Sequence, residues 1–248
     1  MLPRGRAKDR PKYDDRGRGR THHGARIPML KFRVIATLLY DGVALVKGER
    51  FQTWRRVGSL IQAVKLFTLR GADELIILDV AATKEGRGPD LEMVRRVAEH
   101  CFVPLTVGGG VRSVEDVGNL LAAGADRVSI QTKWDIVCEC AAQYGAQAIV
   151  ASVDWTEEGV VHGPLDYGAG EVLLGDTERD GTLQGLRRDD GFGLTGIAMG
   201  GISGPDDCAW AFDHGYSAVA IGALFQFTHW TPALIKRELA QRGVPVRL

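Results

Sequence analysis

The amino-acid sequence predicts an α/β fold, a (βα)8 TIM-type barrel assembled from two half-barrel repeats. Three observations support this prediction: apolar runs alternate with amphipathic stretches from Phe32 onward, eight such runs can be distinguished, and related segments recur in the two halves. The chain has 248 residues, and barrels of this kind commonly form one domain of about 250 residues. We therefore expect residues 29–248 to form a single barrel domain.

The eight strands are expected in apolar runs that are nearly continuous rather than alternating. Such runs are typical of parallel strands whose outer face is covered by helices. The expected strands are Phe32–Tyr40, Glu74–Val80, Leu105–Val107, Arg127–Ile130, Ala148–Val153, Glu171–Leu174, Gly196–Met199 and Ala218–Ile221.

Helical patterns separate several of these strands, and they become sparse in the second half. The expected helices are Gly58–Arg70, Leu91–His100, Ser113–Ala123 and Pro205–His214. Only sixteen residues separate Asp154 from Glu171. A crossover that contains a helix normally needs at least about 10–12 residues, so we expect reduced helices in this half of the barrel wall.

An internal repeat relates the two halves. The segment Gly71–Asp79 matches Gly168–Asp176 without a gap. Gly124 lies fourteen positions after Gly110, and Gly215 lies fourteen positions after Gly201. Because the repeat places equivalent loops at the same end of the barrel, it predicts two similar small-anion sites facing each other.

Glycine-rich loops follow a strand in each half, Gly108–Gly110 in the first and Gly200–Gly201 in the second. Glycine lets the backbone approach an anion closely, and the following helix start offers unpaired N–H groups. The alternative is that these glycines only form tight turns. Two such loops in register favour binding of a phosphorylated small molecule.

The N-terminal residues differ in composition from the rest. Residues 1–28 contain nine Lys or Arg, three acidic residues and few apolar ones, so we expect a disordered extension. Its Arg-Gly pattern could contact nucleic acid, but a solvated extension or a start codon placed too early is favoured, and no nucleic-acid partner is expected. The absence of a long apolar run and of a secretory signal indicates a cytoplasmic protein without a membrane partner.

Four cysteines are scattered through apolar segments and are expected to be reduced thiols. Cys138 and Cys140 lie two apart on an expected helix, so they point to different faces and cannot share a metal ion. We expect neither a metal site nor a cofactor.

Several segments resemble the cyclase subunit of imidazole glycerol phosphate synthase, the HisF family. They are Asp73–Asp79, Thr106–Val111, Gly124–Ile130, Arg179–Thr182 and Arg242–Leu248. The resemblance implies a cytoplasmic lyase subunit of histidine biosynthesis that receives ammonia from a glutaminase (HisH-like) partner. It also implies a substrate with a phosphate at each end.

The resemblance assigns ligand contacts to both halves. Lys47 matches the substrate-facing lysine of the first loop, and Asp79 lies at the same end of the barrel. The residues implied at one phosphate are Gly110, Gln131 and Thr132, and those at the other are Asp180, Gly181, Gly200, Gly201, Gly222 and Ala223.

The family's ring closure requires two aspartates, at the ends of strands one and five. Asp154 occupies the strand-five position, but Leu39 stands at the strand-one position. A leucine can neither donate nor accept a proton. Asp41, two residues later, is a candidate replacement, although its direction is not fixed by strand alternation.

The resemblance also implies an ammonia entrance at the N-terminal end of the barrel, ringed by alternating charges. The matching residues are Arg33, Glu74, Arg127 and Glu171. The alternative is that these four charges only stabilise the base of the barrel.

The pair Leu38-Leu39 and the segment Ala63–Phe67 resemble an offshoot of the family associated with amidation of cell-surface sugars. Three functions therefore stay open: a cyclase-like subunit, a non-cyclising ammonia relay to a sugar amidotransferase, and a phosphate-binding scaffold without activity. Cyclase activity does not follow from the resemblance alone, because the missing aspartate is part of the chemistry.

Overall fold

The fold is taken from a computed structural model, which describes residues 30–131, 134–156, 159–160, 168–188 and 196–248. The predicted extension 1–28 lies outside the described residues, as do Met29 and Thr132.

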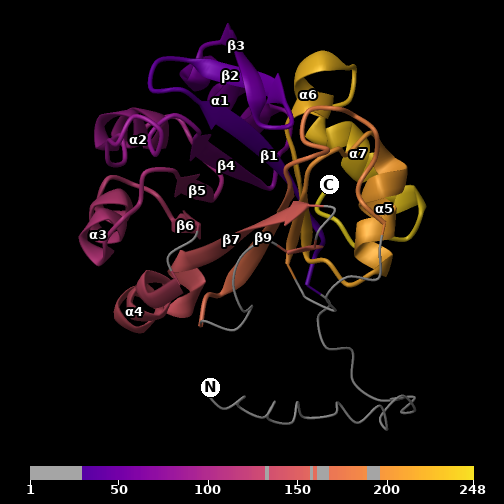
Figure 1. The fold of residues 1–248 in the computed structure, drawn as a ribbon. Coiled ribbons are helices and arrows are strands. Elements are labelled where there is room, and N and C mark those ends of the chain that lie inside the picture. The colour runs from indigo at the N-terminus through magenta and orange to yellow at the C-terminus, as the bar shows by residue number, and fades with distance from the viewer. Residues whose placement is uncertain (1–29, 132–133, 157–158, 161–167, 189–195) are drawn as a thin grey trace, which may run out of the picture.

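Eight parallel strands form a closed barrel, which confirms the predicted fold class (Figure 1). Each strand pairs with the next, and β11 returns to pair with β1, so that Arg33 lies beside Ala218. The barrel strands are β1 (Arg33–Tyr40), β4 (Glu74–Asp79), β5 (Leu105–Gly108), β6 (Arg127–Gln131), β7 (Ile149–Thr156), β9 (Glu171–Asp176), β10 (Ile197–Met199) and β11 (Ala218–Ile221). We call the end where these strands begin the floor and the end where they finish the mouth.

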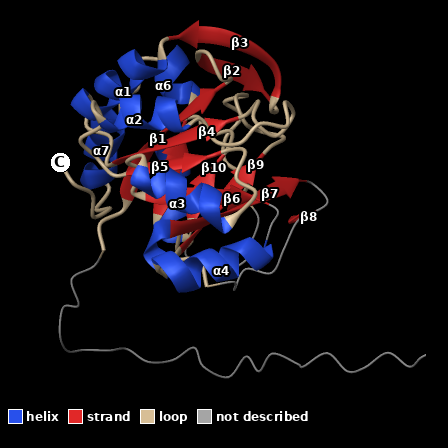
Figure 2. Ribbon diagram, turned by 90° about the vertical axis from the view of Figure 1, so that its left-hand side faces the viewer, coloured by secondary structure: helices blue, strands red, loops and turns tan. Residues whose placement is uncertain are grey.

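Helices cover the outside of the barrel unevenly. The helices are α1 (Leu60–Leu69), α2 (Leu91–Ala98), α3 (Val114–Ala122), α4 (Trp134–Tyr144), η1 (Ala146–Ala148), α5 (Pro205–Asp213), α6 (Ala223–Phe227) and α7 (Pro232–Gln241). Within the described residues, no helix lies between β7 and β9 or between β9 and β10. The described part of the wall is therefore thin where the short spacings predicted it (Figure 2).

A two-stranded hairpin, β2 (Leu45–Glu49) and β3 (Gln52–Gly58), follows β1 and was not predicted. Its turn places Arg50 and Phe51 at φ 53° and φ 54°. Positive φ at both central residues is the requirement of the twisted two-residue hairpin turn. A short strand β8 (Gly159–Val160) pairs antiparallel with the end of β7.

Strand alternation separates the apolar side chains into two clusters. The outward residues pack against the helices and form the larger core. The inward residues form a smaller cluster inside the barrel, made of Ile35, Ile76, Val150, Leu173, Ile197, Met199, Ala218 and Ala220. The lumen is thus a packed apolar layer, as expected of a barrel with eight strands.

The two halves repeat the same backbone geometry at the mouth. Gly109 and Gly200 both have φ +107°, and a Cβ on either would collide with the carbonyl of Asp79 or Asp176 respectively. Only glycine tolerates both the left-handed backbone and this close approach. These matched positions support the duplication inferred from the sequence.

A buried aspartate closes the strand end in each half. Asp79 accepts hydrogen bonds from the backbone N–H groups of the next turn and from Arg87, at 2.6 Å and 2.8 Å. Asp176 does the same and is bound by Arg187 at 2.8 Å. Arg187 also lies over the ring of Trp155, 5.6 Å from its centroid. In the half with fewer helices, this Arg187 clamp ties β7, β9 and the following loop together.

Replacing Arg187 with methionine should therefore lower the free energy of unfolding by about 1–3 kcal/mol, because a buried carboxylate loses its charged partner. The measurement is urea denaturation at pH 7. Arg95→Met is the matched control, because Arg95 makes only a loose surface pair with Glu92 and should change stability by less than about 0.5 kcal/mol. Equal effects of the two changes would contradict the structural role of the clamp.

Candidate functional site

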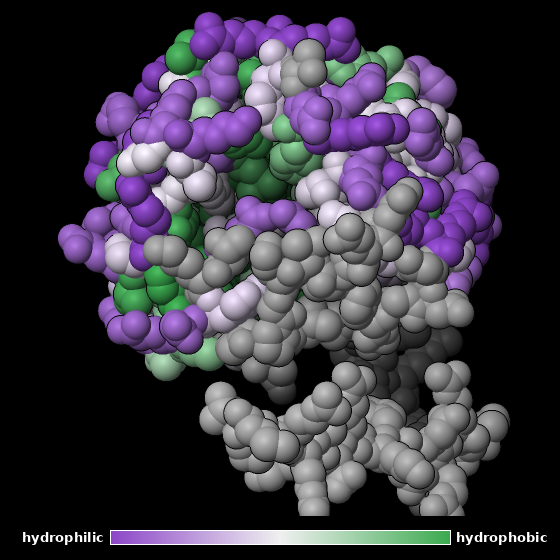
Figure 3. Space-filling model, in the orientation of Figure 1, coloured by the Kyte–Doolittle hydropathy of each residue, from purple (hydrophilic) through white to green (hydrophobic). Residues whose placement is uncertain are grey.

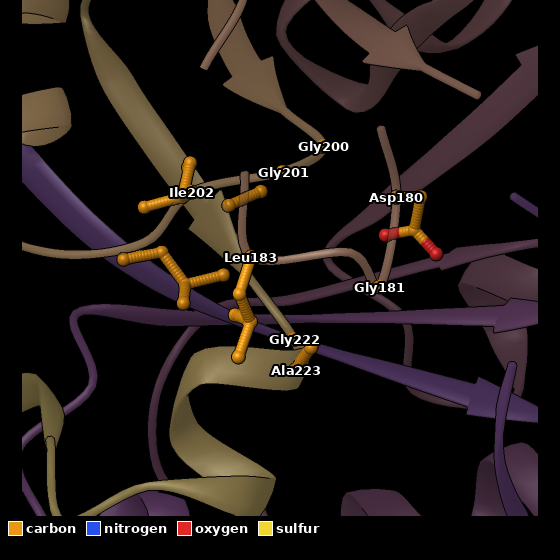
Figure 4. Close-up of a pocket in the computed structure, with 10 residues that line it drawn as sticks. Asp180, Gly181, Leu183, Gly200, Gly201, Ile202, Gly222 and Ala223 are labelled. Atoms are coloured by element: carbon orange, nitrogen blue, oxygen red, sulfur yellow. The ribbon is translucent and has the colours of Figure 1, made fainter. Parts of the chain in front are cut away.

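A pocket at the mouth of the second half collects most of the residues expected there. It is lined by Asp180, Gly181, Leu183, Gly200, Gly201, Ile202, Ala220, Ile221, Gly222 and Ala223 (Figure 4). Three loops meet in it, from β9, β10 and β11. Gly222 precedes α6, and among the described residues no side chain caps the backbone N–H groups at the start of this helix, of which that of Phe225 donates to the carbonyl of Gly222. Such a cradle of backbone N–H groups and glycines suits a phosphate.

The hairpin closes over this pocket. Lys47 is 2% exposed and binds the carboxylate of Asp180 at 2.5 Å. The backbone N–H of Arg50 donates to the carbonyl of Asp180 at 2.8 Å, and Gly181 fits tightly against Gly48. A Cβ built on Gly222 would lie 3.7 Å from the amine of Lys47. The lysine thus stands beside the pocket, where a phosphate could replace Asp180 as its partner.

The first half has an equivalent loop with different neighbours. Gly110 has φ +71° and packs against the loop between β4 and α2. Gln131, at the end of β6, donates to the carboxylate of Asp154 at 2.6 Å. Gln131 and Asp154 are therefore brought together at the mouth, and Thr132 lies outside the described residues.

Two expected carboxylates are held by the protein itself. Both oxygens of Asp79 bind Arg87, so this aspartate acts as the strand-end clamp described above. Asp41 accepts from the backbone N–H of Val43 and Ala44 and from the side chain of Arg56. Burial would raise the pKa of Asp41, but the bonds from Ala44 and Arg56 outweigh it and lower the pKa. Asp41 is therefore a charged turn residue, a poor proton donor at neutral pH.

Leu39 faces the lumen, because side chains two residues apart on a strand point to the same face, and Arg33, Ile35 and Thr37 precede it on the inward face of β1. It is 2% exposed and lies beside Leu78 in the register of β1 and β4. Leu78 and Phe51, from the hairpin tip, pack against the luminal cluster. The mouth end of the lumen is therefore apolar on the side where the resemblance places an acid.

At the floor, Arg33, Glu74, Arg127 and Glu171 form a closed ring of alternating charges. Arg33 binds Glu74 at 2.9 Å and also binds Glu171, while Arg127 binds Glu171 at 2.8 Å and also binds Glu74. Ser217 joins the ring by donating to Glu171 at 2.7 Å. The four residues come from β1, β4, β6 and β9, so the ring spans the barrel.

The ring holds Glu171 and Arg33 in their charged forms. Burial alone would raise the pKa of Glu171, but hydrogen bonds and charge from Arg33, with help from Ser217 and Arg127, lower it. Burial alone would lower the pKa of Arg33, but the hydrogen bonds and charges of Glu171 and Glu74 raise it. The ring is thus a partly buried, fully paired set of four charges, and removing one member leaves its two neighbours short of a counter-charge.

In the part of the chain that the structure describes, no group of three His, Cys, Asp or Glu side chains is placed to bind a metal ion. Among the same residues, no helix combines the length and the apolar character needed to cross a bilayer.

Residues 39–231 match the model of a family described as histidine biosynthesis protein. The chain belongs to this family. A relative from Campylobacter jejuni subsp. jejuni serotype O:2 is 34% identical over 248 aligned residues, which cover 89% of this chain and 100% of the relative. That protein carries the provisional name imidazole glycerol phosphate synthase subunit hisF2. The chain is thus a HisF-type, cyclase-like subunit of the histidine biosynthesis protein family.

Some site residues of this family member were not predicted. Ser217 completes the floor ring, and Arg87 and Arg187 neutralise the two strand-end aspartates. A serine after Gly215 carries no signal of its own. The two arginines could have been found from the repeat, because each follows an aspartate that the repeat had already matched.

Replacing Glu171 with glutamine should lower the free energy of unfolding by about 2–4 kcal/mol at pH 7, because Arg33 and Arg127 lose a buried counter-charge. The folded-state pKa of Glu171 lies below its ordinary value of 4.5. The advantage of the wild type is therefore complete above pH 4.5 and is lost as the pH falls through the folded-state pKa.

Urea denaturation of both proteins between pH 7 and pH 3 measures this difference. The exposed Glu92→Gln is the control and should show little difference at any pH. A stability difference between wild type and Glu171→Gln that stays constant over this range would contradict the paired ring.

Proposed function

We propose that the protein is a glutaminase-dependent ammonia-handling subunit that takes ammonia in at the barrel floor and passes it on without cyclising a substrate. One contrast carries the proposal: the charged ring at the floor is complete, whereas Leu39 occupies the luminal position of the acid at the mouth. The entrance features are kept, and half of the acid–base pair is missing.

The polarity of the packed lumen favours a small neutral molecule over a charged one. The apolar cluster above the ring disfavours the charged ammonium ion, because burying an unpaired charge is costly. Thr37 and Thr106 face the same space, and their buried hydroxyls have no partner in the described part of the chain. These hydroxyls can hydrogen-bond to ammonia, which both donates and accepts.

The floor surface supports docking of a glutaminase. Phe102 lies in the turn from α2 to β5 and is 83% exposed, and Leu248 at the chain end is 87% exposed. Large apolar side chains exposed around a functional opening are typical of a protein–protein interface. The partner would then deliver ammonia directly onto the ring formed by Arg33 and Glu171.

The mouth supports ligand binding more strongly than ring closure. Lys47 and the pocket at Gly222 fit a phosphorylated small molecule. Asp154 is present, but proton transfer in a ring closure needs a second group on the opposite side. Each of two such groups contributes about 10²–10⁴-fold, so a leucine in one position removes most of the rate.

The second candidate is a lyase of histidine biosynthesis in which the barrel itself cyclises a nucleotide-derived substrate. The observations that favour it are the retained Asp154 and the matched glycine loops of both halves. A bare phosphate-binding scaffold is the third possibility. For the non-cyclising function, the acceptor of ammonia would be a separate sugar amidotransferase, with all components in the cytoplasm.

Restoring the acid tests the first candidate against the second. Wild type should show no turnover of the family's aminoimidazole carboxamide ribonucleotide intermediate with saturating ammonium, and Leu39→Asp should gain at least about 100-fold over that background. Product formation is followed by its absorbance change. The double variant Leu39→Asp/Asp154→Asn is the control and should lose the gain. Wild-type turnover would establish the cyclase instead.

Coupling to a glutaminase tests the entrance. Titrating the protein into a purified HisH-like glutaminase should raise the rate of glutamine hydrolysis at least about 10-fold, which corresponds to lowering its activation free energy by about 1.4 kcal/mol. Phe102→Asp should abolish the effect by breaking the interface, whereas Val43→Asp, exposed at the mouth, should leave it intact. Arg33→Ala should keep the complex and uncouple ammonia transfer. If no glutaminase is bound or activated, the proposal fails.

A further inference from the structure

A groove on the outside of the barrel runs along α1. One wall is the face of α1 that carries Gln62, Lys65, Leu66 and Leu69. The other wall is formed by Phe225–Phe227 of α6. The hairpin base at Leu45 and Val57 closes one end. The groove has a volume of about 690 Å³, which is within the range of binding sites that enclose a ligand.

The groove exposes an unusual amount of apolar surface. Leu66 is 41%, Leu69 86%, Val57 36% and Phe227 45% exposed. The face of α1 that packs on the barrel is a different one, formed by Leu60, Ala63, Val64 and Phe67. The helix is thus apolar on two sides, and only one of them is covered in the described structure. A contiguous exposed apolar surface of this kind marks an interaction site.

The charges along the groove have one sign. Lys65 and Arg70 line it, no acidic residue does, and in the described ranges no salt bridge joins either of them to a carboxylate. Arg55 lies over the exposed ring of Phe227, 5.1 Å from its centroid, and adds a third positive charge at one end. An occupant with carboxylates beside an apolar face would be complementary, whereas a second copy of the same basic groove would be repelled.

A polar group in the wall also lacks a partner. The side-chain amide of Gln226 is buried, and neither its oxygen nor its nitrogen forms a hydrogen bond among the described residues. An unsatisfied buried amide is costly, so rotation of this side chain toward the groove, where an amide of an occupant can pair with both of its atoms, would be favourable. This amide is independent of the charge pattern and points to a peptide rather than a hydrocarbon.

We propose that this groove binds an amphipathic helical segment of a partner protein, with an apolar face flanked by acidic residues. Helix α1 is ten residues long, or about 15 Å, and the groove follows it from Gln62 to Leu69. An amphipathic helix laid in such a groove anchors through its own i, i+3, i+4 and i+7 side chains. The groove is separate from the mouth pocket and from the charged ring. The inference therefore does not depend on the proposed ammonia-handling function.

Two labelled 14-residue helical peptides test the proposal by fluorescence anisotropy with the full chain. They share one leucine face at i, i+3, i+4 and i+7 and carry either glutamates or lysines beside it. The glutamate peptide should bind with a micromolar Kd that weakens as salt is raised, and the lysine peptide should bind at least about 10-fold more weakly.

Leu66→Glu should weaken binding of the glutamate peptide at least about 10-fold. Because Leu66 is partly exposed, the variant should fold normally. Leu30→Glu, 93% exposed and outside the groove, is the control and should bind the peptide as the wild type does. The charge swap Lys65→Glu/Arg70→Glu should reverse the preference and favour the lysine peptide. Binding that Leu66→Glu leaves unchanged, or a preference that the charge swap does not reverse, would overturn the proposal.

Discussion

Closure of the sheet between β11 and β1 is the constraint on which the other features depend, because it forces every second side chain of each strand into one enclosed space. Arg33 and Glu171 are carried to the floor by this alternation, so they must neutralise each other where water is scarce. The next residues inward are apolar and fill the lumen. At the mouth, the same alternation leaves Leu39 facing inward, and glycines there allow the loops to approach one another.

The surface is organised around this closed centre. Figure 3 shows hydrophobic side chains in a hollow near the middle of the viewed face, with mostly hydrophilic residues around it. The proposed functions therefore lie in three regions: paired charges at the floor, a glycine-lined pocket under Lys47 at the mouth, and the groove beside α1. The floor ring shares no residue with the other two, so it can be altered by substitution while they keep their geometry, whereas the pocket and the groove both use β2 and α6.

The sequence predicted the eight barrel strands because buried parallel strands have a distinctive, nearly continuous apolar pattern. The hairpin was missed because its turn residues, Arg50 and Phe51, are not those that usually adopt a positive φ. Helix α4 was expected around Cys138 and Cys140 but without bounds, since only Val137 and Cys140 along it are buried. Helix α7 could have been found from Thr231, which caps it, and Pro232 at its first turn.

Of the candidate site, the sequence indicated which residue types occupy the floor and the mouth, but not how they are paired. Resemblance pointed to Lys47 and Asp180 separately, and their bond depends on the fold of the hairpin between β1 and α1. It also pointed to Asp79, whose binding by Arg87 is decided by a loop conformation that no local pattern encodes.

The unequal halves have a further consequence for dynamics. Among the described residues no helix flanks β9, and β10 has only three residues. Backbone amides on that side should therefore exchange with solvent faster than those of β1 and β4. The barrel should open locally between these strands before it unfolds as a whole.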